Sequence, residues 1–237
     1  MGIVGAAGLS EEDTVVEIGP GPGRLTKLLA ERAKKVMAIE LDQDLFERLK
    51  GDLIGYRNVE LIHGDALKFP FEDIGEFKVV ANIPYYITTP IIFRLLEARK
   101  TLKSMTLTIQ KEVAERIVAS PGGKDYGVLS IMIQYYARPE MKFIVPKEAF
   151  KPVPKVDSAV VNMTLLDRPS VETKDESMLF RLVKTAFSQR RKTLSNSLKS
   201  VSGDIKDSLI RAGIDPQRRP ETLSLEEFSR LADSLIQ

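Results

Sequence analysis

The tetrapeptide Asn82-Ile83-Pro84-Tyr85 combines side chains that could hold a planar amine. The Asn82 amide offers a carbonyl acceptor, Pro84 fixes its own φ and has no N–H donor, and Tyr85 supplies an aromatic face. Together they could accept the hydrogens of an exocyclic amino group while its ring stacks on the tyrosine. Alone, such a tetrapeptide is more often an ordinary turn after a strand, so the elements around it decide between the two interpretations.

Apolar, β-branched runs predict the strands that would position this loop. The run 77–81 ends directly at Asn82, and in open α/β sheets ligands bind at the carboxyl ends of such strands. Further strands are predicted at 14–18, 35–39, 59–62, 104–110, 141–145 and 159–165. Helices are predicted at 3–9, 24–33, 43–53, 89–98 and 128–137. We expect a mostly parallel sheet in which the last two strands form an antiparallel pair at one edge.

A glycine-rich turn follows the first predicted strand. Gly19, Gly21 and Gly23 come directly after the strand that contains Glu17, and a helical pattern begins at Arg24. Glycines let the backbone approach a ligand closely, and the start of the helix adds exposed N–H groups. Glu40 ends the second strand about 20 residues further on, which suits the hydroxyls of a ribose. This order of elements predicts a nucleotide-binding βαβ unit.

The segment Gly64-Asp65-Ala66 follows the third strand and has two interpretations. Asp65 could accept a hydrogen bond from the exocyclic amine of an adenine, or it could be a plain helix-capping aspartate. The cofactor could be a dinucleotide or S-adenosylmethionine, because the glycine spacing is one residue short of the dinucleotide fingerprint. The loop at Asn82 favours methyl transfer to an amine.

Composition describes an ordinary globular chain. Its 237 residues are 43% hydrophobic and 29% charged, and no run approaches the roughly 18 apolar residues that a membrane span needs. We therefore expect a cytoplasmic protein with no membrane partner. The absence of cysteine excludes disulfides, thiolate zinc sites and a cysteine nucleophile. His63 is the one histidine, and we predict no metal site.

The C-terminal part carries a basic helical pattern. Residues 166–170 read as a linker, which predicts one domain at 1–166 and a helical domain at 167–237. From Arg181 to Arg219 there are ten Lys and Arg against three Asp, in a chain whose net charge is +2. Arg190, Arg191 and Lys192 lie at the centre of this excess. Such a segment is either a solvated helix face or a surface that contacts phosphates.

Five ordered motifs resemble the rRNA adenine dimethyltransferases. They are Glu17 to Gly23, Gly64-Asp65-Ala66, Asn82 to Tyr85, Gln110 to Ala114, and Phe150 to Ser158. The segments 187–194 and 213–224 resemble the KsgA-like small-subunit branch more than the macrolide-resistance branch, which modifies large-subunit RNA. The resemblance implies a Rossmann-like methyltransferase sheet with a small all-α RNA-binding domain. It also implies that S-adenosylmethionine is the cofactor and that two adjacent adenines near the 3′ end of 16S rRNA are dimethylated during small-subunit biogenesis, by a monomer.

The resemblance also implies a role for each matching residue. The turn from Gly19 to Gly23, with Glu17, would hold the methionine part of the cofactor, and Glu40 its ribose. Asp65 and Ala66 would hold the adenine of the cofactor. Asn82 and Pro84 would hold the target amine next to the cofactor, and Tyr85 and Phe150 would enclose the target base. Arg190, Arg191 and Lys192 would bind RNA.

Three alternatives to this interpretation remain open. The chain could be a large-subunit enzyme of the resistance type, a non-catalytic ribosome-assembly factor, or an oxidoreductase.

Family members begin with a basic segment and a helix carrying a Gly-Gln-Asn-Phe-like motif, which this sequence does not show. We therefore expect a looser hold on the methionine half of the cofactor.

Overall fold

The computed structural model describes residues 2–236, which form two compact units. The first unit runs to Ala114 and includes Pro139–Leu165. The second comprises Glu115–Arg138 and the chain from Leu166 onward. Residues 115–138, which the sequence assigned to the first domain, instead belong to the same unit as the C-terminal helices.

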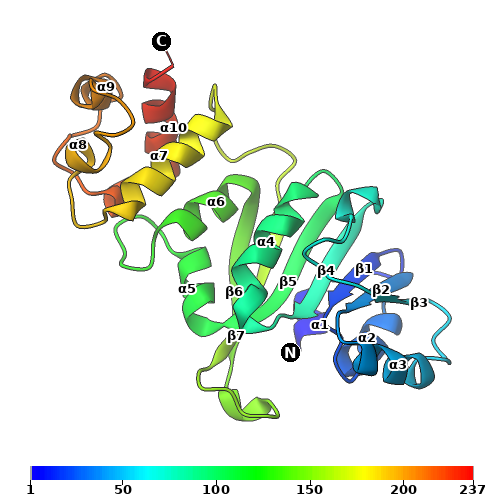
Figure 1. Cartoon of the computed structure of the whole chain (residues 1–237). Coiled ribbons are helices and arrows are strands. Elements are labelled where there is room, and N and C mark those ends of the chain that lie inside the picture. Colours follow the sequence, from blue (N-terminus) through cyan, green and yellow to red (C-terminus); the bar gives the residue numbers. More distant parts are fainter. Residues whose placement is uncertain (1, 237) are drawn as a thin grey trace. The chain divides into compact units, whose positions relative to one another are not determined.

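A seven-stranded sheet forms the centre of the first unit (Figure 1). Its order is β3-β2-β1-β4-β5-β7-β6, with β1 to β5 parallel and β7 antiparallel to β5. The predicted mostly parallel sheet with an antiparallel edge is confirmed. The strands are β1 (Thr14–Ile18), β2 (Lys35–Glu40), β3 (Val59–His63), β4 (Phe77–Asn82), β5 (Leu102–Gln110), β6 (Ala137–Val145) and β7 (Ser158–Leu165).

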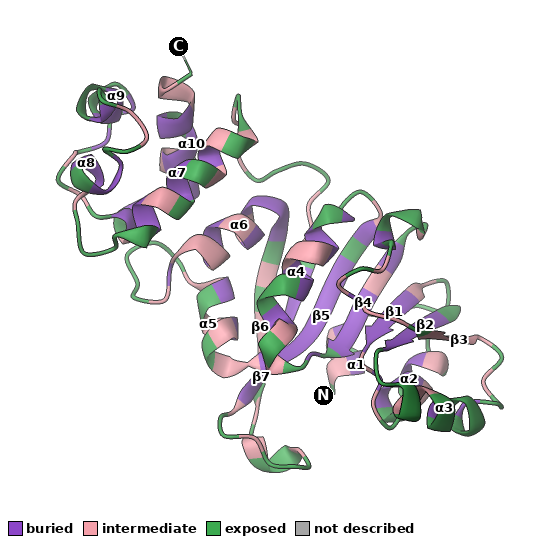
Figure 2. Cartoon of the chain, viewed as in Figure 1, coloured by how far each residue is buried: buried purple, intermediate pink, exposed green. Residues whose placement is uncertain are grey.

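Apolar residues on both faces explain why these runs form central strands. Val15, Val16, Val79 and Val80 are fully buried, and Figure 2 shows the central strands buried along most of their length. Continuous apolar runs are typical of parallel strands that are covered by helices on both faces. The helices of this unit are α1 (Ile3–Ala6), α2 (Arg24–Ala30), α3 (Gln43–Asp52) and α4 (Thr88–Glu97).

Several predicted boundaries were wrong by a few residues. Helix α2 ends at Ala30 rather than residue 33, and α1 ends at Ala6, before Gly8 turns left-handed with φ 56°. Strand β6 begins at Ala137 rather than residue 141. The strand continues through Arg138 and Pro139, whose polarity and fixed φ hide its start from a pattern of apolar residues.

The second unit is helical. Leu179, Leu182 and Val183 of α7 are fully buried in its core, as are Phe228 and Leu231 of α10. The helices of this unit are α6 (Val128–Tyr136), α7 (Glu176–Ser188), α8 (Leu194–Ser197), α9 (Ile205–Arg211) and α10 (Leu225–Ser234), while α5 (Lys111–Val118) begins in the first unit. Within residues 2–236, no helix has both the length and the apolar character needed to cross a membrane.

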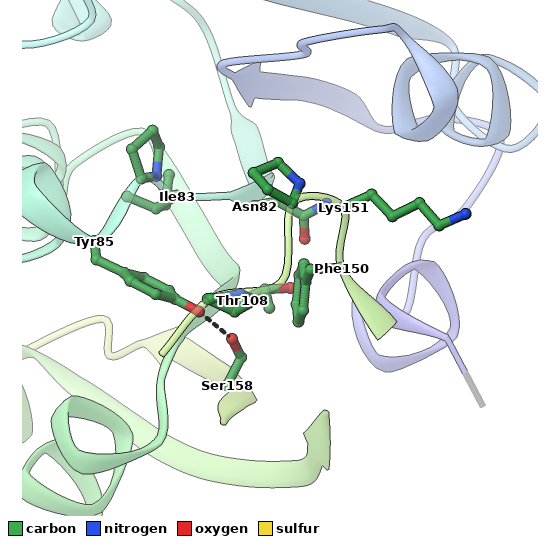
Figure 3. A pocket seen from close by; sticks show the side chains of 10 residues that line it. Asn82, Ile83, Tyr85, Thr108, Phe150, Lys151 and Ser158 are labelled. Carbon is green, nitrogen blue, oxygen red and sulfur yellow. Dashed lines mark hydrogen bonds between the residues drawn. The ribbon is translucent and has the colours of Figure 1, made fainter. Parts of the chain in front are cut away.

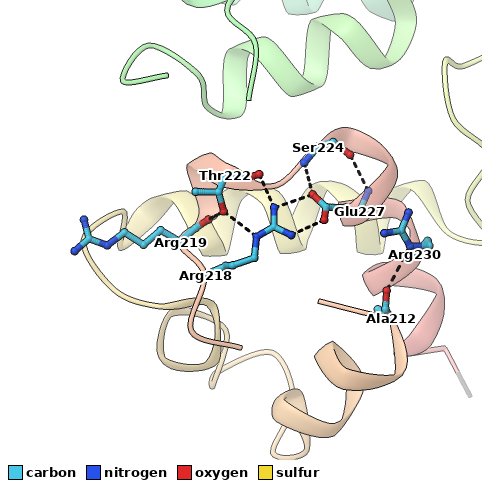
Figure 4. Close-up of polar contacts among 7 residues, drawn as sticks. All are labelled: Ala212, Arg218, Arg219, Thr222, Ser224, Glu227 and Arg230. Carbon is cyan, nitrogen blue, oxygen red and sulfur yellow. Dashed lines mark hydrogen bonds and ion pairs between the residues drawn. The ribbon is translucent and has the colours of Figure 1, made fainter. Parts of the chain in front are cut away.

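Arg218 fixes the turn that leads into α10 (Figure 4). Its guanidinium donates to both carboxylate oxygens of Glu227, at 2.5 and 3.0 Å, and to the Thr222 carbonyl at 2.6 Å. Glu227 also completes a capping box by accepting from the Ser224 N–H at 2.8 Å. The hydrogen bonds from Arg218 hold the pKa of the Glu227 carboxyl below its usual range. Arg218 is therefore engaged inside the unit rather than presented to a partner.

Candidate functional site

The turn between β1 and α2 adopts a backbone that only glycine takes easily. Gly19, Gly21 and Gly23 have φ of 66°, 54° and 73°, in the left-handed region that other residues rarely occupy. A Cβ on Gly23 would lie 2.7 Å from Cδ2 of the buried Leu49, so this glycine also allows α2 and α3 to pack closely. The turn therefore presents bare backbone at the carboxyl edge of the sheet.

Glu40 ties this turn to the end of β2. Its carboxylate accepts hydrogen bonds from the N–H of Gly21 at 3.2 Å and of Asp42 at 2.9 Å. Glu17, at the end of β1, is also buried, and its Oε2 has no hydrogen-bond partner among residues 2–236. Burial, with a smaller contribution from the nearby Glu40 charge, raises the pKa of Glu17 to about 7. Two carboxyl groups thus lie beside the glycine turn, and one of them has an unused buried oxygen.

A pocket of about 250 Å³ opens beside this turn; we call it the glycine-turn pocket. Its lining comes from the ends of β1, β2 and β3 and from the loop after β4. The lining residues are Ile18, Gly19, Ile39, Glu40, Leu41, Gly64, Asp65, Ala66, Leu67, Pro84, Tyr86 and Ile87.

Asp65 forms the hydrogen bond that its interpretation as a capping residue predicted. One oxygen, Oδ1, accepts from the Leu67 N–H at 2.9 Å, which is the bond expected of a capping aspartate. The other, Oδ2, lies 4.0 Å from the exposed ammonium of Lys68. The carboxylate is therefore held in place by one oxygen, while the second is available to accept a hydrogen bond from a ligand in the pocket.

A second pocket, of about 520 Å³, lies at the ends of β4 and β5; we call it the Asn82 pocket (Figure 3). The exposed Asn82 ends β4, and the Ile83 N–H donates to the Thr108 carbonyl of β5 at 3.1 Å. Pro84 lines both pockets, so the two adjoin at this proline. The lining residues are Asn82, Ile83, Pro84, Tyr85, Thr108, Phe150, Lys151, Pro152, Pro154 and Ser158.

The aromatic side chain of Tyr85 is tied to the far side of this pocket. Its hydroxyl lies 2.8 Å from Ser158 Oγ at the start of β7 (Figure 3). Phe150 reaches the same pocket from the loop between β6 and β7. An exposed amide, two aromatic rings and a proline therefore surround a space that adjoins the glycine turn. Such a space suits a flat base that carries an amino group.

Comparison with known proteins decides the family. The family model described as "Ribosomal RNA adenine dimethylase" matches residues 1–237. The chain belongs to this family. The resemblance inferred from the five motifs is confirmed, and so is the prediction of an S-adenosylmethionine-dependent rRNA adenine dimethyltransferase.

Similar proteins come from bacteria and from a eukaryotic parasite. The chain is 51% identical to the ribosomal RNA small subunit methyltransferase A of Clostridium botulinum (strain Loch Maree / Type A3), over 98% of this chain and 87% of that protein. It is 48% identical to the protein of that name from Moorella thermoacetica, over 98% and 86%. Among solved structures, a dimethyladenosine transferase from Plasmodium falciparum matches with a TM-score of 0.81 and 30% identity, over 97% of this chain and 92% of that one. The 23S rRNA methyltransferase ErmE matches with a TM-score of 0.78 and 31% identity, over 99% and 96%.

The structure brings most of the predicted site residues of this family member together. Gly19, Glu40, Asp65 and Ala66 line the glycine-turn pocket. Asn82, Pro84, Tyr85 and Phe150 line the Asn82 pocket. Glu17, Gly21 and Gly23 do not line either pocket: Gly21 binds Glu40, Glu17 is buried near Glu40, and Gly23 packs on Leu49. The individual roles of all these residues stay predictions.

The sequence did not indicate the contributions of Thr108 and Ser158. Thr108 anchors the loop after β4 through its backbone carbonyl, a role to which any residue type is suited. Ser158 belongs to the motif that starts at Phe150, but its hydrogen bond to Tyr85 joins residues 73 positions apart. The spacing of apolar residues in helices and strands reports only local structure, so it cannot predict such a pair.

The predicted RNA-binding segment lies in the helical unit, after α7. Arg190 donates to the carbonyls of Lys124 and Tyr126 at 2.7 and 3.1 Å, and its guanidinium lies 5.8 Å from the centre of the Phe187 ring. This residue holds the 124–126 loop to the end of α7. Arg191 and Lys192 are exposed. Arg190 is exposed as well, but it already has partners, so Arg191 and Lys192 are better placed to meet phosphates.

Proposed function

We propose that this chain transfers methyl groups to the exocyclic amines of two adjacent adenines near the 3′ end of 16S rRNA, in the small ribosomal subunit or its precursor. The observation that carries the proposal is the Asn82 pocket, which adjoins the glycine-turn pocket at Pro84. Each adenine would gain two methyl groups.

The residues beside the glycine turn fit S-adenosylmethionine. The turn offers backbone with no side chains, Glu40 and Asp65 offer carboxylate oxygens for ribose hydroxyls and an adenine amine, and Glu17 has an unused buried oxygen. The bound cofactor would supply an electrophilic methyl group. The turn with Glu17 would hold its methionine part, Glu40 its ribose, and Asp65 with Ala66 its adenine.

The chemistry required of the protein is to hold and orient a weak nucleophile. The lone pair of an adenine amine is conjugated with the ring. Accepting both hydrogens, through the Asn82 carbonyl and the acceptors around Pro84, would make the nitrogen pyramidal and free its lone pair. Holding the reactants in the right orientation can lower the activation barrier by roughly 7–11 kcal/mol. No strong base is required, because the ammonium formed on the base loses its proton readily.

Tyr85 and Phe150 would compensate for removing the base from its stack. A base must leave the RNA stack to reach a pocket, which costs a few kcal/mol. Stacking on an aromatic side chain is worth about 1–3 kcal/mol per base. One ring from the loop after β4 and one from the loop before β7 line the same pocket, so that both faces of the adenine would be covered.

Sequence identity favours the small subunit over the large one. The proteins named small subunit methyltransferase A are 46–51% identical to this chain, compared with 31% for the 23S enzyme. The test is to incubate unmethylated small and large subunits with labelled S-adenosylmethionine and to identify the modified nucleoside. Dimethyladenosine in the small subunit alone supports the proposal. Label in the large subunit would favour the resistance-type activity, and label in neither would favour a non-catalytic assembly factor.

A further inference from the structure

The Tyr85 side chain is held at its hydroxyl, and the loop that carries it is fixed at Ile83. On the backbone side, the Ile83 N–H donates to the Thr108 carbonyl at 3.1 Å, which fixes the loop after β4 to β5. At the other end, the Tyr85 hydroxyl lies 2.8 Å from the Oγ of Ser158, a residue with no exposed surface. The Tyr85 side chain therefore reaches from the loop after β4 to the start of β7. Its rotation about the side-chain bonds is restricted before any base arrives.

The neighbouring residue, Asp157, organises the loop that carries Phe150. Its Oδ1 accepts from the Lys147 N–H at 3.1 Å, and this bond joins the two ends of the loop 147–157. The Phe150 N–H in turn donates to the Lys147 carbonyl at 3.1 Å. The backbone carbonyl of Asp157 accepts from the Lys111 N–H at 3.0 Å. The end of this loop at Asp157 is thus fixed to the chain directly after β5.

Strand β5 places these groups relative to Asn82. Thr108 pairs with Asn82 on one side and with Val160 of β7 on the other, and Gln110 pairs with Ser158. The backbone pairing therefore sets the separation between the Asn82 amide and the Ser158 hydroxyl. Two adjacent residues, 157 and 158, each send a side-chain hydrogen bond toward a segment that carries one of the two aromatic rings.

We propose that Ser158 and Asp157 are positioning residues for the target base, Ser158 by fixing the Tyr85 ring and Asp157 by fixing the Phe150 loop. The proposal rests on the proposed function, in which these rings enclose the adenine. Neither residue acts on the amine itself. Their effect is to keep the space between the rings ready for a flat base, so that binding need not order the rings first.

Ser158→Ala and Tyr85→Phe each remove one partner of the same hydrogen bond and leave the aromatic ring in place. We expect each to lower the single-turnover rate of methyl transfer to unmethylated small subunits about tenfold at saturating cofactor. The double variant should be no slower than either single variant, because the two substitutions remove the same hydrogen bond. Calorimetry should give unchanged S-adenosylmethionine affinity, since neither residue lines the glycine-turn pocket.

Thr106→Val is a matched control for stability. It removes a buried hydrogen bond of the same length, 2.8 Å, from Asn162 of β7 to Thr106 of β5, away from both pockets. Thermal unfolding should show losses of stability of the same order in Thr106→Val and Ser158→Ala, while Thr106→Val keeps the wild-type transfer rate. An equal loss of rate in Thr106→Val would show that Ser158 acts only on stability and would overturn the proposal.

Asp157 is tested by a conservative rescue. Asp157→Ala removes the acceptor for the Lys147 N–H, whereas Asp157→Asn retains a carbonyl oxygen there. We expect about a tenfold higher half-saturating subunit concentration for the alanine variant and near-wild-type behaviour for the asparagine variant. Wild-type kinetics in Ser158→Ala and Asp157→Ala, or losses that multiply in the Tyr85–Ser158 double variant, would overturn the proposal. Failure of the wild-type chain to methylate small subunits would instead overturn the proposed function.

Discussion

Substitution of Asn82 should change the rate of methyl transfer with little effect on the stability of the fold. Its side chain is exposed at the end of β4, so Asn82→Ala should leave the free energy of unfolding nearly unchanged. The variant removes an acceptor that matters most as the amine becomes pyramidal, and losing one such oriented polar group typically lowers kcat by about 10²–10³. Steady-state methyl transfer and urea unfolding measure the two effects. Gln43→Ala, an exposed amide on α3 outside both pockets, is the control, and near-normal turnover in Asn82→Ala would disprove the assigned role.

Glu17 predicts a pH dependence of stability with a definite sign. Its pKa is about 7 in the folded chain, mainly through burial, against an ordinary value of 4.5. Between these values the unfolded chain loses the proton first, so this group's contribution to stability is full below 4.5 and is lost as the pH rises through 7. Relative to wild type, Glu17→Gln should therefore gain about 3 kcal/mol in unfolding free energy between roughly pH 5 and pH 8.

Urea unfolding of both chains across this pH range measures the difference. Glu11→Gln, at an exposed position, gives the background trend. A constant difference between Glu17→Gln and wild type would mean that Glu17 does not hold its proton in the folded chain.

At the scale of elements, alanine variants of the glycine turn distinguish the cost of an unfavourable backbone conformation from the cost of a steric clash. Gly21 and Gly23 both have positive φ, and alanine there costs about 1–2 kcal/mol. A Cβ at Gly21 would meet nothing within 4 Å, whereas at Gly23 it would lie 2.7 Å from Leu49 Cδ2. Gly23→Ala should therefore be more destabilising than Gly21→Ala by about 1–3 kcal/mol. Chemical unfolding of the two variants measures this, and equal losses would show that Leu49 moves aside freely.

The elements of the sheet were predictable because their signals are local. Apolar runs such as 77–81 stop where the chain leaves the sheet, and the polar residue at each stop marks the carboxyl edge that carries Glu40, Asp65 and Asn82. Contacts across long separations were not predictable. The Ser158–Tyr85 bond, the Arg190 bonds to backbone carbonyls and the packing of residues 115–138 depend on the folded arrangement, which no local period encodes.

At the scale of the whole molecule, the predicted RNA-binding segment, Arg190 to Lys192, should govern how binding to ribosomal RNA depends on salt. Arg191 and Lys192 are exposed, and replacing each with alanine should lower the slope of log affinity against log salt by about 0.7–0.9 for every phosphate that is no longer neutralised. Arg190→Ala should instead lower the stability of the helical unit, because it removes the bonds to Lys124 and Tyr126. Filter binding over a salt series measures the slopes.

Lys174→Ala is the control for this series, since Lys174 is exposed in the same unit but lies outside the segment. An unchanged slope in the Arg191→Ala/Lys192→Ala double variant would favour the alternative interpretation, in which this segment is only a solvated surface.

Mapping the product on the RNA tests the central claim most directly, because the claim joins the cofactor, the site and the substrate. Unmethylated small subunits are incubated with the wild-type chain and S-adenosylmethionine, and the 16S rRNA is then digested and sequenced by mass spectrometry. We predict two adjacent adenines near the 3′ end, each with two methyl groups on its exocyclic nitrogen, and no such product with Asn82→Ala. Methylation at another position or of another base, or equal product with Asn82→Ala, would contradict the account.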